Sequence, residues 1–458
     1  MRGVVSFQRG RISGVFEINI SADQLVSRLL HISKSEPVFI LDSCGVGHLG
    51  SHLLIAGVRP KETLEVENND PERTLRFLDE KLSQNLAAIF TLSYDFGIKL
   101  QPGFEEPVVT GDEPDIFIAL FDELLVHDYD SGRTQIVGES DTAGTLSDLI
   151  ETHRGEIEPA HPTQSAGRAT SNFTKAEYVT AVERVREYIR SGDTYQTNLT
   201  QQLTCTLPPG ATPESIYWRL RRDHPAPFSA FLRRPGSTVV SASPERFFRV
   251  SETGIIEASP IKGTRRRGED AGSDRMLRTE LLSSEKDRAE NTMIVDLLRN
   301  DLGRVCNFGS VEVTKLCDLE EHPTLFHLVS TIRGSLQSGV KFSEILRATF
   351  PCGSITGAPK VRTMDIIAEI ENTSRGLSMG AIGAFFPPTW KLQSAGIDSV
   401  FDVSVAIRTM VIREGEAVFN VGGGIVIDSD PEKEFEESLL KAQALLAALG
   451  AVLPGNGA

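Results

Sequence analysis

The chain has 458 residues, of which 40% are apolar and 24% charged, with 47 Lys and Arg against 63 Asp and Glu. These proportions are typical of a globular protein and exclude a disordered chain, a collagen or a coiled coil for most of the length. The net charge of −16 argues against broad nucleic-acid binding, and no apolar run reaches the roughly 18 residues that span a bilayer.

The N-terminus and the cysteines indicate the compartment. Arg2, Arg9 and Arg11 stand among polar residues without an apolar core, which is not the pattern of a secretory signal. The five cysteines show no C-x-x-C spacing, so we interpret them as free thiols in a reducing environment. The sequence therefore predicts a cytoplasmic protein.

Short apolar runs separated by turn residues predict strands in the first 140 residues. These runs cover residues 37–41, 53–58, 87–92 and 116–126. Residues 139–171 are rich in Ser, Thr, Gly, Pro and acidic residues without an apolar period, so we interpret them as a linker or mobile segment. The predicted organisation is an N-terminal domain over 1–138, this segment, and a second domain over 172–450.

A helix is predicted after this segment, because Thr174 and Glu177 form a T-x-x-E capping box and Gly192 marks a stop. Its apolar face comprises Tyr178, Val182, Val185 and Ile189. Two further helices are predicted over 284–302 and 431–449, the last one opened by Asp430 and Pro431. The predicted strands between them cover 195–207, 228–232, 239–242, 246–250, 254–261, 380–386, 400–413 and 416–421. Strands and helices without regular alternation predict an α+β fold.

Two glycine-rich segments offer backbone amides without obstruction by side chains. Residues 353–360 read GSITGAPK and residues 422–424 are three glycines, but neither has the spacing of a nucleotide-binding loop. Each segment is either a tight turn or a place where a small anion is held by backbone amides.

Paired acids stand near the start of two predicted helices. Asp287 and Glu290 are three residues apart, as are Glu434 and Glu437, so each pair shares a helix face. These acids either complement the helix dipole, with Lys441 in an ion pair to Glu437, or converge to bind a divalent cation such as Mg²⁺.

Lys262, Glu245 and His327 are the other residues with chemical potential. Lys262 ends the apolar run 254–261 and is either a solvated strand end or an amine in a pocket, where a desolvated ammonium becomes a nucleophile. Glu245 either pairs with Arg246 or donates a proton. His327 lies in an apolar context, which suits a core histidine as well as a catalytic one.

Together and in order, these segments resemble the chorismate-utilising enzymes, which include anthranilate synthase, aminodeoxychorismate synthase, isochorismate synthase and salicylate synthase. The segments that carry the resemblance are GDTYQTNLTQ (192–201), SASPERF (241–247), SPIKGTRRRG (259–268), ENTMIVDLLRNDLGRVC (290–306), HLVSTIRG (327–334), FPCGSITGAPKVRTMDIIAEIE (350–371), RGLSMGAIGAF (375–385), AIRT (406–409) and VGGGIVIDSDPEKEFEESLLKAQAL (421–445). The resemblance is nearly complete over 172–447 and looser before it. It implies a large two-sheet, sandwich-like core with helices packed outside.

The lysine at position 262 resembles the aminodeoxychorismate synthases, whereas anthranilate synthases usually have alanine there. The resemblance thus implies that Lys262 attacks C2 of chorismate, Glu245 protonates the departing C4 hydroxyl, and ammonia adds at C4 and expels the lysine. His327 matches a histidine near the leaving group. The implied product is 4-amino-4-deoxychorismate, for 4-aminobenzoate and folate biosynthesis.

Other residues match the family's binding groups. The implied substrate-carboxylate groups are Ser354, Arg408, Gly423, Gly424 and Lys441, and the implied Mg²⁺ ligands are Asp287, Glu290, Glu434 and Glu437. Position 287 usually carries Glu, and Ser378 stands where the family often has Tyr. A candidate tryptophan pocket matches Ser43, Pro227, Phe228 and Ser229, but Gly50, His52 and Phe228 replace the usual Tyr, Arg and Tyr, so we do not expect tryptophan to bind.

Ammonia must come from elsewhere, because no cysteine has a glutaminase or nucleophile-elbow context. We expect a separate glutamine amidotransferase partner, and another enzyme for the step to 4-aminobenzoate. Two alternatives remain open at this stage. The chain is an anthranilate synthase component I, or it is a non-catalytic chorismate-binding protein, for which Ser378 is the most suggestive feature.

Overall fold

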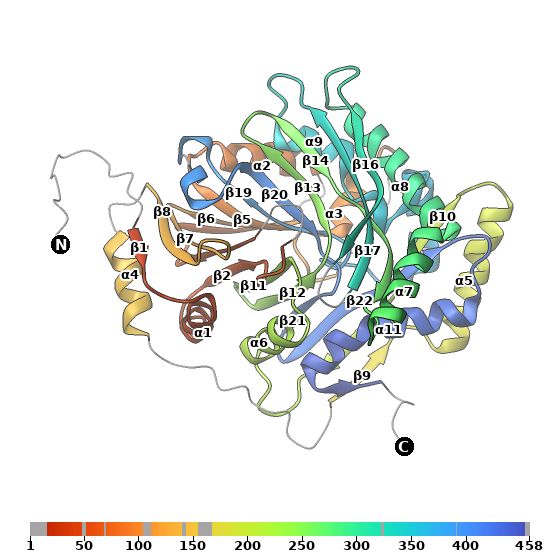
Figure 1. Ribbon diagram of the computed structural model, residues 1–458, viewed down its shortest axis with the longest axis horizontal. Coiled ribbons are helices and arrows are strands. Elements are labelled where there is room, and N and C mark those ends of the chain that lie inside the picture. The colour runs from red at the N-terminus through yellow and green to blue at the C-terminus, as the bar shows by residue number, and fades with distance from the viewer. Residues whose placement is uncertain are drawn as a thin grey trace.

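The computed structural model describes residues 16–47, 52–67, 70–103, 111–139, 143–153, 167–321, 325–390 and 392–453. The strands of these residues form two large sheets that lie one above the other, with helices on the two outer faces (Figure 1). The predicted two-sheet α+β fold is therefore confirmed. In the described residues, no helix is both long and apolar enough to cross a membrane.

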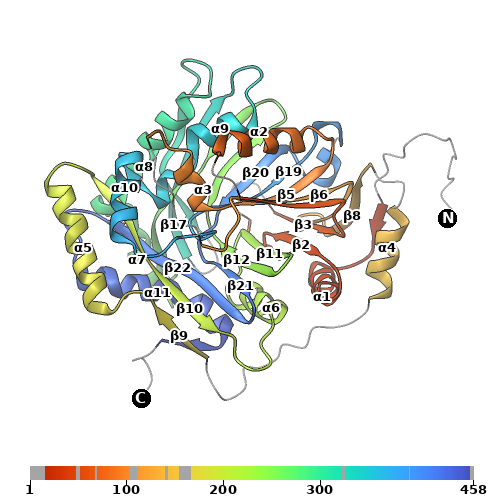
Figure 2. The same ribbon diagram turned by 180° about the vertical axis from the view of Figure 1, so that it is seen from behind.

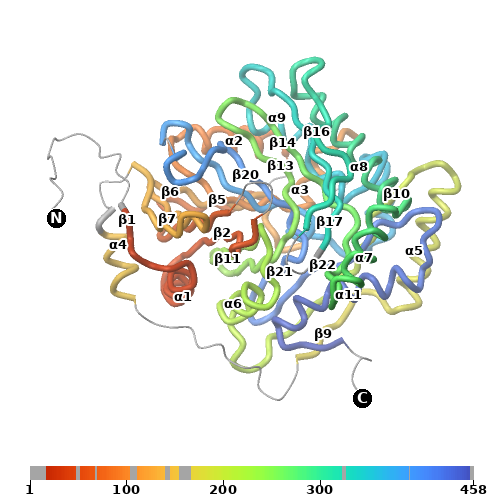
Figure 3. Tube along the Cα trace, in the orientation of Figure 1, coloured from red at the N-terminus to blue at the C-terminus, as the bar shows by residue number. Residues whose placement is uncertain are grey.

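The first sheet has 13 strands and draws on both ends of the chain. In spatial order they are β1 (Phe16–Ile18), β8 (Arg133–Gly138), β7 (Glu123–Asp128), β3 (Leu53–Val58), β2 (Val38–Asp42), β11 (Phe228–Arg234), β12 (Ser237–Ser243), β21 (Thr409–Arg413), β22 (Glu416–Ile425), β10 (Gln196–Thr206), β9 (Gly167–Ser171) and β23 (Ala451–Val452), with β18 (Gly357–Ala358) beside β10. Figure 3 shows β2, from the N-terminal third, running beside β11.

The second sheet has 10 strands and is equally mixed in origin. In spatial order they are β15 (Ile261–Arg266), β17 (Leu325–Ser335), β14 (Ile255–Ala258), β13 (Arg246–Ser251), β20 (Ser399–Val405), β19 (Ala381–Phe385), β5 (Ala87–Leu92), β6 (Ile116–Phe121) and β4 (Glu62–Val66), with β16 (Glu312–Glu321) beside β17. Since both sheets combine strands from before and after residue 171, the two predicted domains interleave, and their boundary stays a prediction.

The helices cover the outer faces. They are α1 (Ala22–Ile32), α2 (Pro71–Leu82), α3 (Tyr94–Lys99), α4 (Ala143–Thr152), α5 (Lys175–Arg190), α6 (Pro213–Asp223), α7 (Ala271–Ser283), α8 (Glu285–Gly303), α9 (Phe342–Thr349), α10 (Lys360–Ile370) and α11 (Pro431–Leu449), with short 3-10 turns η1 (Gly353–Ile355), η2 (Pro388–Trp390) and η3 (Leu392–Ala395). Helices α2 and α9 lie over the second sheet and α1 and α6 over the first, as Figures 1 and 2 both show.

The strands are buried on both faces, which explains their continuous apolar runs. Ala87 and Ile89 of β5 face the core between the two sheets, while Ala88, Phe90 and Leu92 face the helices outside. Successive side chains of a strand point to opposite faces, so one strand contributes to two cores.

Capping signals gave helix starts, and the apolar runs 53–58 and 87–92 gave the ends of β3 and β5, but longer apolar runs did not give strand ends. Helix α5 has the predicted Thr174–Glu177 capping box, and α11 begins after Asp430 as predicted. The predicted single strands over 116–126 and 400–413 are wrong, because each is two strands that belong to different sheets. The run 254–261 also breaks, since Ser259 and Pro260 separate β14 from β15.

The prediction of an irregular linker over 139–171 is wrong in two stretches. Residues 143–152 form α4, whose Leu146 and Ile150 are buried, and residues 167–171 form β9. Two apolar residues four apart are enough to anchor a short helix, and the polar composition around them hid this spacing. Residues 140–142 and 154–166 of the predicted linker lie outside the described residues.

Candidate active site

The site is built where the chain crosses from one sheet to the other. Strand β12 of the first sheet passes into β13 of the second through Glu245, and β20 passes back into β21 through Arg408. The two crossings lie side by side, because the Val405 N–H donates to the Glu245 carbonyl at 3.1 Å and the Ser243 hydroxyl donates to the Val405 carbonyl at 2.6 Å. Residues 160 apart in sequence are thus joined.

Lys262 lies at the second position of β15, not past the end of a strand as the sequence suggested. Its side chain is half-buried, and Nζ stands 3.5 Å from the carbonyl oxygen of Ser354, longer than an ordinary hydrogen bond. Among the described residues its amine has no ion pair within salt-bridge distance. Strand β15 therefore positions the amine, and its contact with the Ser354 carbonyl is weak.

Glu245 is a buried acid on which the charge of the Lys262 amine acts. Its side chain is buried, and no described residue forms a hydrogen bond with its Oε1. Burial raises the pKa of Glu245 although the Lys262 ammonium acts in the opposite direction. Its carboxyl group therefore keeps its proton to higher pH than an exposed glutamate, as a general acid requires.

His327 lies on β17, which pairs with β15, and its backbone is in register with Thr264. Its ring Nδ1 is 2.9 Å from the Thr264 hydroxyl, which orients the buried imidazole. His327 therefore lies opposite Thr264, which is two residues after Lys262 on β15.

The loop at residues 352–359, called the 352–359 loop below, brings Ser354 to the same place. Ser354 is buried in η1, and its hydroxyl is 3.3 Å from the Cys352 sulfur. Burial raises the pKa of the Cys352 thiol to about 12, so this cysteine stays protonated and is no nucleophile. That agrees with the absence of a glutaminase pattern.

Arg408 begins the crossing into β21 with φ at +48°, in the left-handed region. Its guanidinium group makes no hydrogen bond or ion pair with a described residue, and burial lowers its pKa. A half-buried cation with no internal partner is available to an anionic ligand.

The glycines of β22 form the opposite wall. A Cβ at Gly422 would lie 1.9 Å from the Leu199 carbonyl, so only glycine fits there, and one at Gly424 would lie 2.2 Å from Nε2 of Gln196, whose side chain would have to move. A Cβ at Gly423 would instead point at Lys441, Glu434 and Glu437, at 3.3 to 3.5 Å. Backbone amides here are thus unobstructed beside a charged cluster.

Two helices direct their acids toward this cluster. Lys441 Nζ donates to the Gly422 carbonyl at 2.9 Å and pairs with Glu437 at 2.8 Å. Burial would raise the pKa of Glu437, but Lys441, Lys286 and Lys262 lower it. Lys262 and the acids of α11 are therefore within electrostatic reach of each other.

On α8, burial raises the pKa of Glu290, opposed by Lys262 and Lys286 and assisted by Asp287 and Glu434. Burial and the neighbouring Glu437 likewise raise the pKa of Glu434, whose Oε1 accepts from the Ser429 hydroxyl at 2.6 Å. Like charges that oppose each other's ionisation are what a bound cation would relieve.

The fourth predicted ligand, Asp287, is engaged with a protein cation, since Arg265 contacts its Oδ2 at 3.2 Å. No group of three or more His, Cys, Asp or Glu side chains in the described residues forms a ready-made metal cage. The oxygen donors suit Mg²⁺, and the metal site stays a prediction.

The four residues of the candidate tryptophan pocket also come together. Ser43, Pro227, Phe228 and Ser229 line one cavity between the two sheets, with Asp42, Arg249 and Asp402 around them. Of the substituted positions, Gly50 lies outside the described residues, and His52 pairs with Asp130 at 2.7 Å. Tryptophan binding stays untested.

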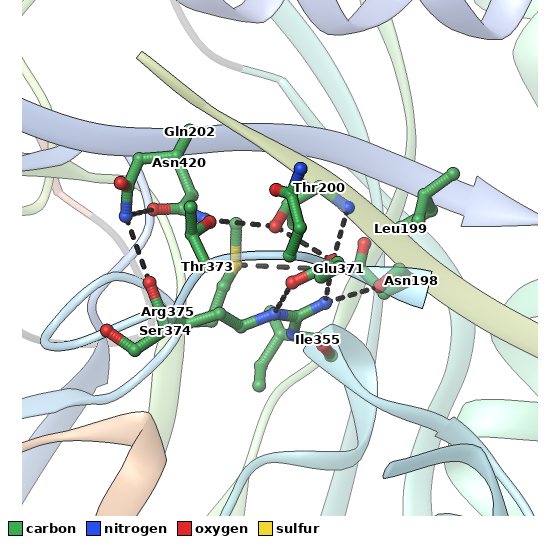
Figure 4. A network of polar contacts seen from close by, with 12 residues as sticks. Asn198, Leu199, Thr200, Gln202, Ile355, Glu371, Thr373, Ser374, Arg375 and Asn420 are labelled. Carbon is green, nitrogen blue, oxygen red and sulfur yellow. Dashed lines mark hydrogen bonds and ion pairs between the residues drawn. The ribbon is translucent and has the colours of Figure 1, made fainter. Parts of the chain in front are cut away.

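Sequence reasoning missed an ionic network beside the site. Glu371 and Arg375 form a buried ion pair that contacts the 352–359 loop and β10 (Figure 4). The available signal was an acid and an arginine four residues apart, just past the end of α10. Nothing in that spacing showed that the pair would be buried.

Comparison with known proteins identifies the family. A family model described as chorismate binding enzyme matches residues 36–447. The chain belongs to the chorismate-binding enzyme family. The family resemblance inferred from the sequence motifs is thereby confirmed.

Two curated relatives are aminodeoxychorismate synthases. The chain is 36% identical over 426 residues to aminodeoxychorismate synthase of Streptomyces pristinaespiralis, covering 86% of this chain but only 56% of that protein. It is 37% identical over 377 residues to aminodeoxychorismate synthase component 1 of Bacillus subtilis, covering 79% of this chain and 76% of that protein.

Anthranilate synthases of the family are also similar. Anthranilate synthase component 1 1 of Haloarcula marismortui is 43% identical over 283 residues, covering 62% of this chain and 55% of that protein. The crystal structure of anthranilate synthase component I from Streptococcus pneumoniae superposes with a TM-score of 0.70 at 26% identity, covering 97% of this chain and 94% of that one. Overall similarity therefore fixes the family, and the site residues must distinguish the reactions.

Proposed function

We propose that this chain is an aminodeoxychorismate synthase component I, which replaces the C4 hydroxyl of chorismate by an amino group to give 4-amino-4-deoxychorismate for 4-aminobenzoate and folate biosynthesis. One observation carries the proposal. The Lys262 amine lies on β15 with no ion-pair partner among the described residues, within electrostatic reach of the buried acid Glu245. A nucleophile and a proton donor are thus held on neighbouring elements.

The first displacement forms a covalent intermediate. The Lys262 amine, after giving a proton to solvent, attacks C2 of chorismate, both ring double bonds shift, and the C4–O bond breaks. Glu245 gives its proton to the departing oxygen, so water leaves. We assign His327, whose ring contacts the Thr264 hydroxyl, to the side of the leaving group.

The second displacement restores the ring. Ammonia adds at C4, both ring double bonds shift back, and the C2–N bond breaks with its electron pair returning to the Lys262 nitrogen, while the Glu245 carboxylate takes up the proton that the new C4 ammonium loses. Two successive displacements place the new amine on the carbon that carried the hydroxyl. Attack by ammonia at C2 without the lysine would place it where anthranilate needs it.

Charge neutralisation explains how an acidic protein binds a dianion. Arg408 and the amides near Gly423 and Gly424 are available to one carboxylate, and Ser354 and Lys441 add donors. Asp287, Glu290, Glu434 and Glu437 would hold Mg²⁺, which supplies positive charge for the ring carboxylate when it is bound.

The ammonia source we propose is a separate glutamine amidotransferase. The Bacillus subtilis relative is named component 1, which implies a second component in that protein. Cys352 is protonated and buried, so it does not supply glutaminase chemistry.

Product identification tests the proposal. The protein is incubated with chorismate, Mg²⁺ and ammonium, and the product is identified by mass spectrometry. We expect 4-amino-4-deoxychorismate, dependence on Mg²⁺, and loss of activity with EDTA that added Mg²⁺ restores. Anthranilate fluorescence without any lyase would show the rival activity, and binding of chorismate without turnover would show a non-catalytic protein.

A further inference from the structure

The ion pair between Glu371 and Arg375 lies between two walls of the site without reaching either set of catalytic groups. Their side chains are 3% and 2% exposed, and the guanidinium contacts both carboxylate oxygens, at 2.8 Å from Nε to Oε2 and 2.7 Å from Nη2 to Oε1 (Figure 4). The guanidinium also stacks 4.5 Å from the ring centre of Tyr94. The Arg375 guanidinium is therefore held both by the Glu371 carboxylate and by the Tyr94 ring.

Both partners also hold backbone on two separate segments. Arg375 donates from Nη1 to the Ile355 carbonyl at 3.1 Å and from Nη2 to the Asn198 carbonyl at 2.6 Å. Glu371 Oε1 accepts from the Thr200 N–H at 2.7 Å and from its hydroxyl at 2.9 Å. One fork thus fastens the 352–359 loop to β10.

Each fastened segment lies next to residues of the site. Ile355 follows Ser354, whose carbonyl faces the Lys262 amine. On β10, residues 198, 199 and 200 pair in register with Gly424, Gly423 and Gly422. The ion pair consequently lies at the junction between the wall that faces the nucleophile and the glycine wall.

Stability alone does not account for an ion pair at this place. A buried pair loses its hydration, and well-packed apolar residues often give equal stability. What apolar residues cannot reproduce is a planar fork that fixes two carbonyls at once. The feature that the ionic pair adds is therefore geometric.

We propose that Glu371 and Arg375 are positioning residues, which set the distance between the 352–359 loop and β10 and so hold the Lys262 side of the site in place relative to the glycines of β22. This inference rests on the proposed function for its kinetic consequence. It does not rest on it for the structural coupling.

The test is Arg375→Lys, which keeps the positive charge but replaces the fork by a single ammonium. A lysine cannot hold both carbonyls while it pairs with Glu371 through two bonds. We expect kcat for chorismate with ammonium to fall about 10- to 100-fold, with KM changed by less than about threefold, because displaced groups react more slowly. Amide hydrogen exchange should accelerate about tenfold at residues 352–359 and 198–200.

A control of matched chemistry lies in the same part of the core, because Glu113 stands beside Gly376, the residue after Arg375. Arg234 and Glu113 form another buried bidentate pair, with side chains 0% and 7% exposed and contacts of 2.5 and 2.9 Å. Arg234→Lys and Arg375→Lys should lower the melting temperature by similar amounts. Arg234→Lys should nevertheless leave kcat within about twofold of the wild-type value. Equal kcat losses in the two variants, or unchanged kcat in Arg375→Lys, would overturn the positioning role.

Folding failure and failure of the proposed function are both distinguishable. If Arg375→Lys does not fold, Thr200→Val removes one bond to Glu371, and a kcat loss of about threefold is expected; unchanged kcat would overturn the inference.

If the wild-type protein makes another product, the rate for that product is compared in the same way. If it does not turn over chorismate, the proposed function fails, and hydrogen exchange decides: unaltered protection at 352–359 in Arg375→Lys overturns the coupling, and selective loss supports it.

Discussion

The candidate active site and the surroundings of the cavity between the sheets differ in how particular charged groups are paired. In the cavity, Arg246 pairs with both oxygens of Asp402 at 3.0 Å, and Asp42 accepts from Arg221 and Tyr129 at 2.7 Å. In the active site, Arg408 has no partner among the described residues and Glu245 Oε1 accepts no hydrogen bond.

The difference separates structural charge from functional charge. Removing one partner of a buried ion pair leaves the other charge buried and uncompensated, which costs stability, whereas a charge that the fold leaves unpaired is available to a ligand. The exception in the cavity is the Ser43 hydroxyl, which has no hydrogen-bond partner among the described residues. The comparison predicts that active-site changes alter rates and cavity changes alter stability.

The largest effect should come from Lys262. Lys262→Ala removes the nucleophile, so we expect formation of 4-amino-4-deoxychorismate to fall at least about 10³-fold, measured by mass spectrometry of the products. Lys262→Arg keeps the charge without a nucleophilic amine and should fall as far. Substantial activity in either variant would reject covalent catalysis.

Glu245→Gln keeps the shape but cannot donate the acid proton. We expect kcat to fall about 10²-fold. Since burial raises the pKa of Glu245 and the protonated form is the active one, wild-type kcat should be full at low pH with respect to this group and decline as pH rises through that pKa. A pH–rate profile of the variant should lack this alkaline decline; its persistence would assign the acid to another residue.

Arg408→Ala should weaken substrate binding more than chemistry. We expect KM for chorismate to rise about 10- to 100-fold, because a charge-assisted contact to a carboxylate is lost, while stability to urea stays equal or increases. Arg413→Ala, at the far end of β21, is the control; its side chain is 34% exposed and paired with Asp112, and the substitution should leave KM unchanged. A stability loss without a change in KM would place Arg408 among the structural charges.

The smallest effect on rate should come from the cavity. Asp402→Ala removes both carboxylate contacts from the buried Arg246 guanidinium, so urea denaturation should show a loss of about 3 kcal/mol. The kcat of the folded enzyme should change by less than about twofold. A large kcat loss at unchanged stability would show that the cavity acts on the active site.

Local rules succeeded where the interactions are local. The capping residues Thr174, Glu177 and Asp430 gave the ends of α5 and α11, because side chain and backbone partners lie within three residues. The same rule applies to α1, where Ser21 and Gln24 form a capping box. This signal was present in the sequence, so the helix was predictable, but it was missed. The motifs also named Lys262, Glu245 and the paired acids, since their order along the chain carries the family resemblance.

The sequence by itself thus determined the family, the chemical groups and the capped helices. Only the tertiary structure decided that strands 116–126 and 400–413 divide between two sheets, and that Glu245 and Arg408 stand at adjacent crossings. It also decided that the Glu371–Arg375 pair is buried between the two walls of the site. These features depend on pairing between segments that are distant in sequence, such as Val405 with Glu245 and Arg375 with Asn198, and a strand buried on both faces has the same apolar composition whichever sheet it joins.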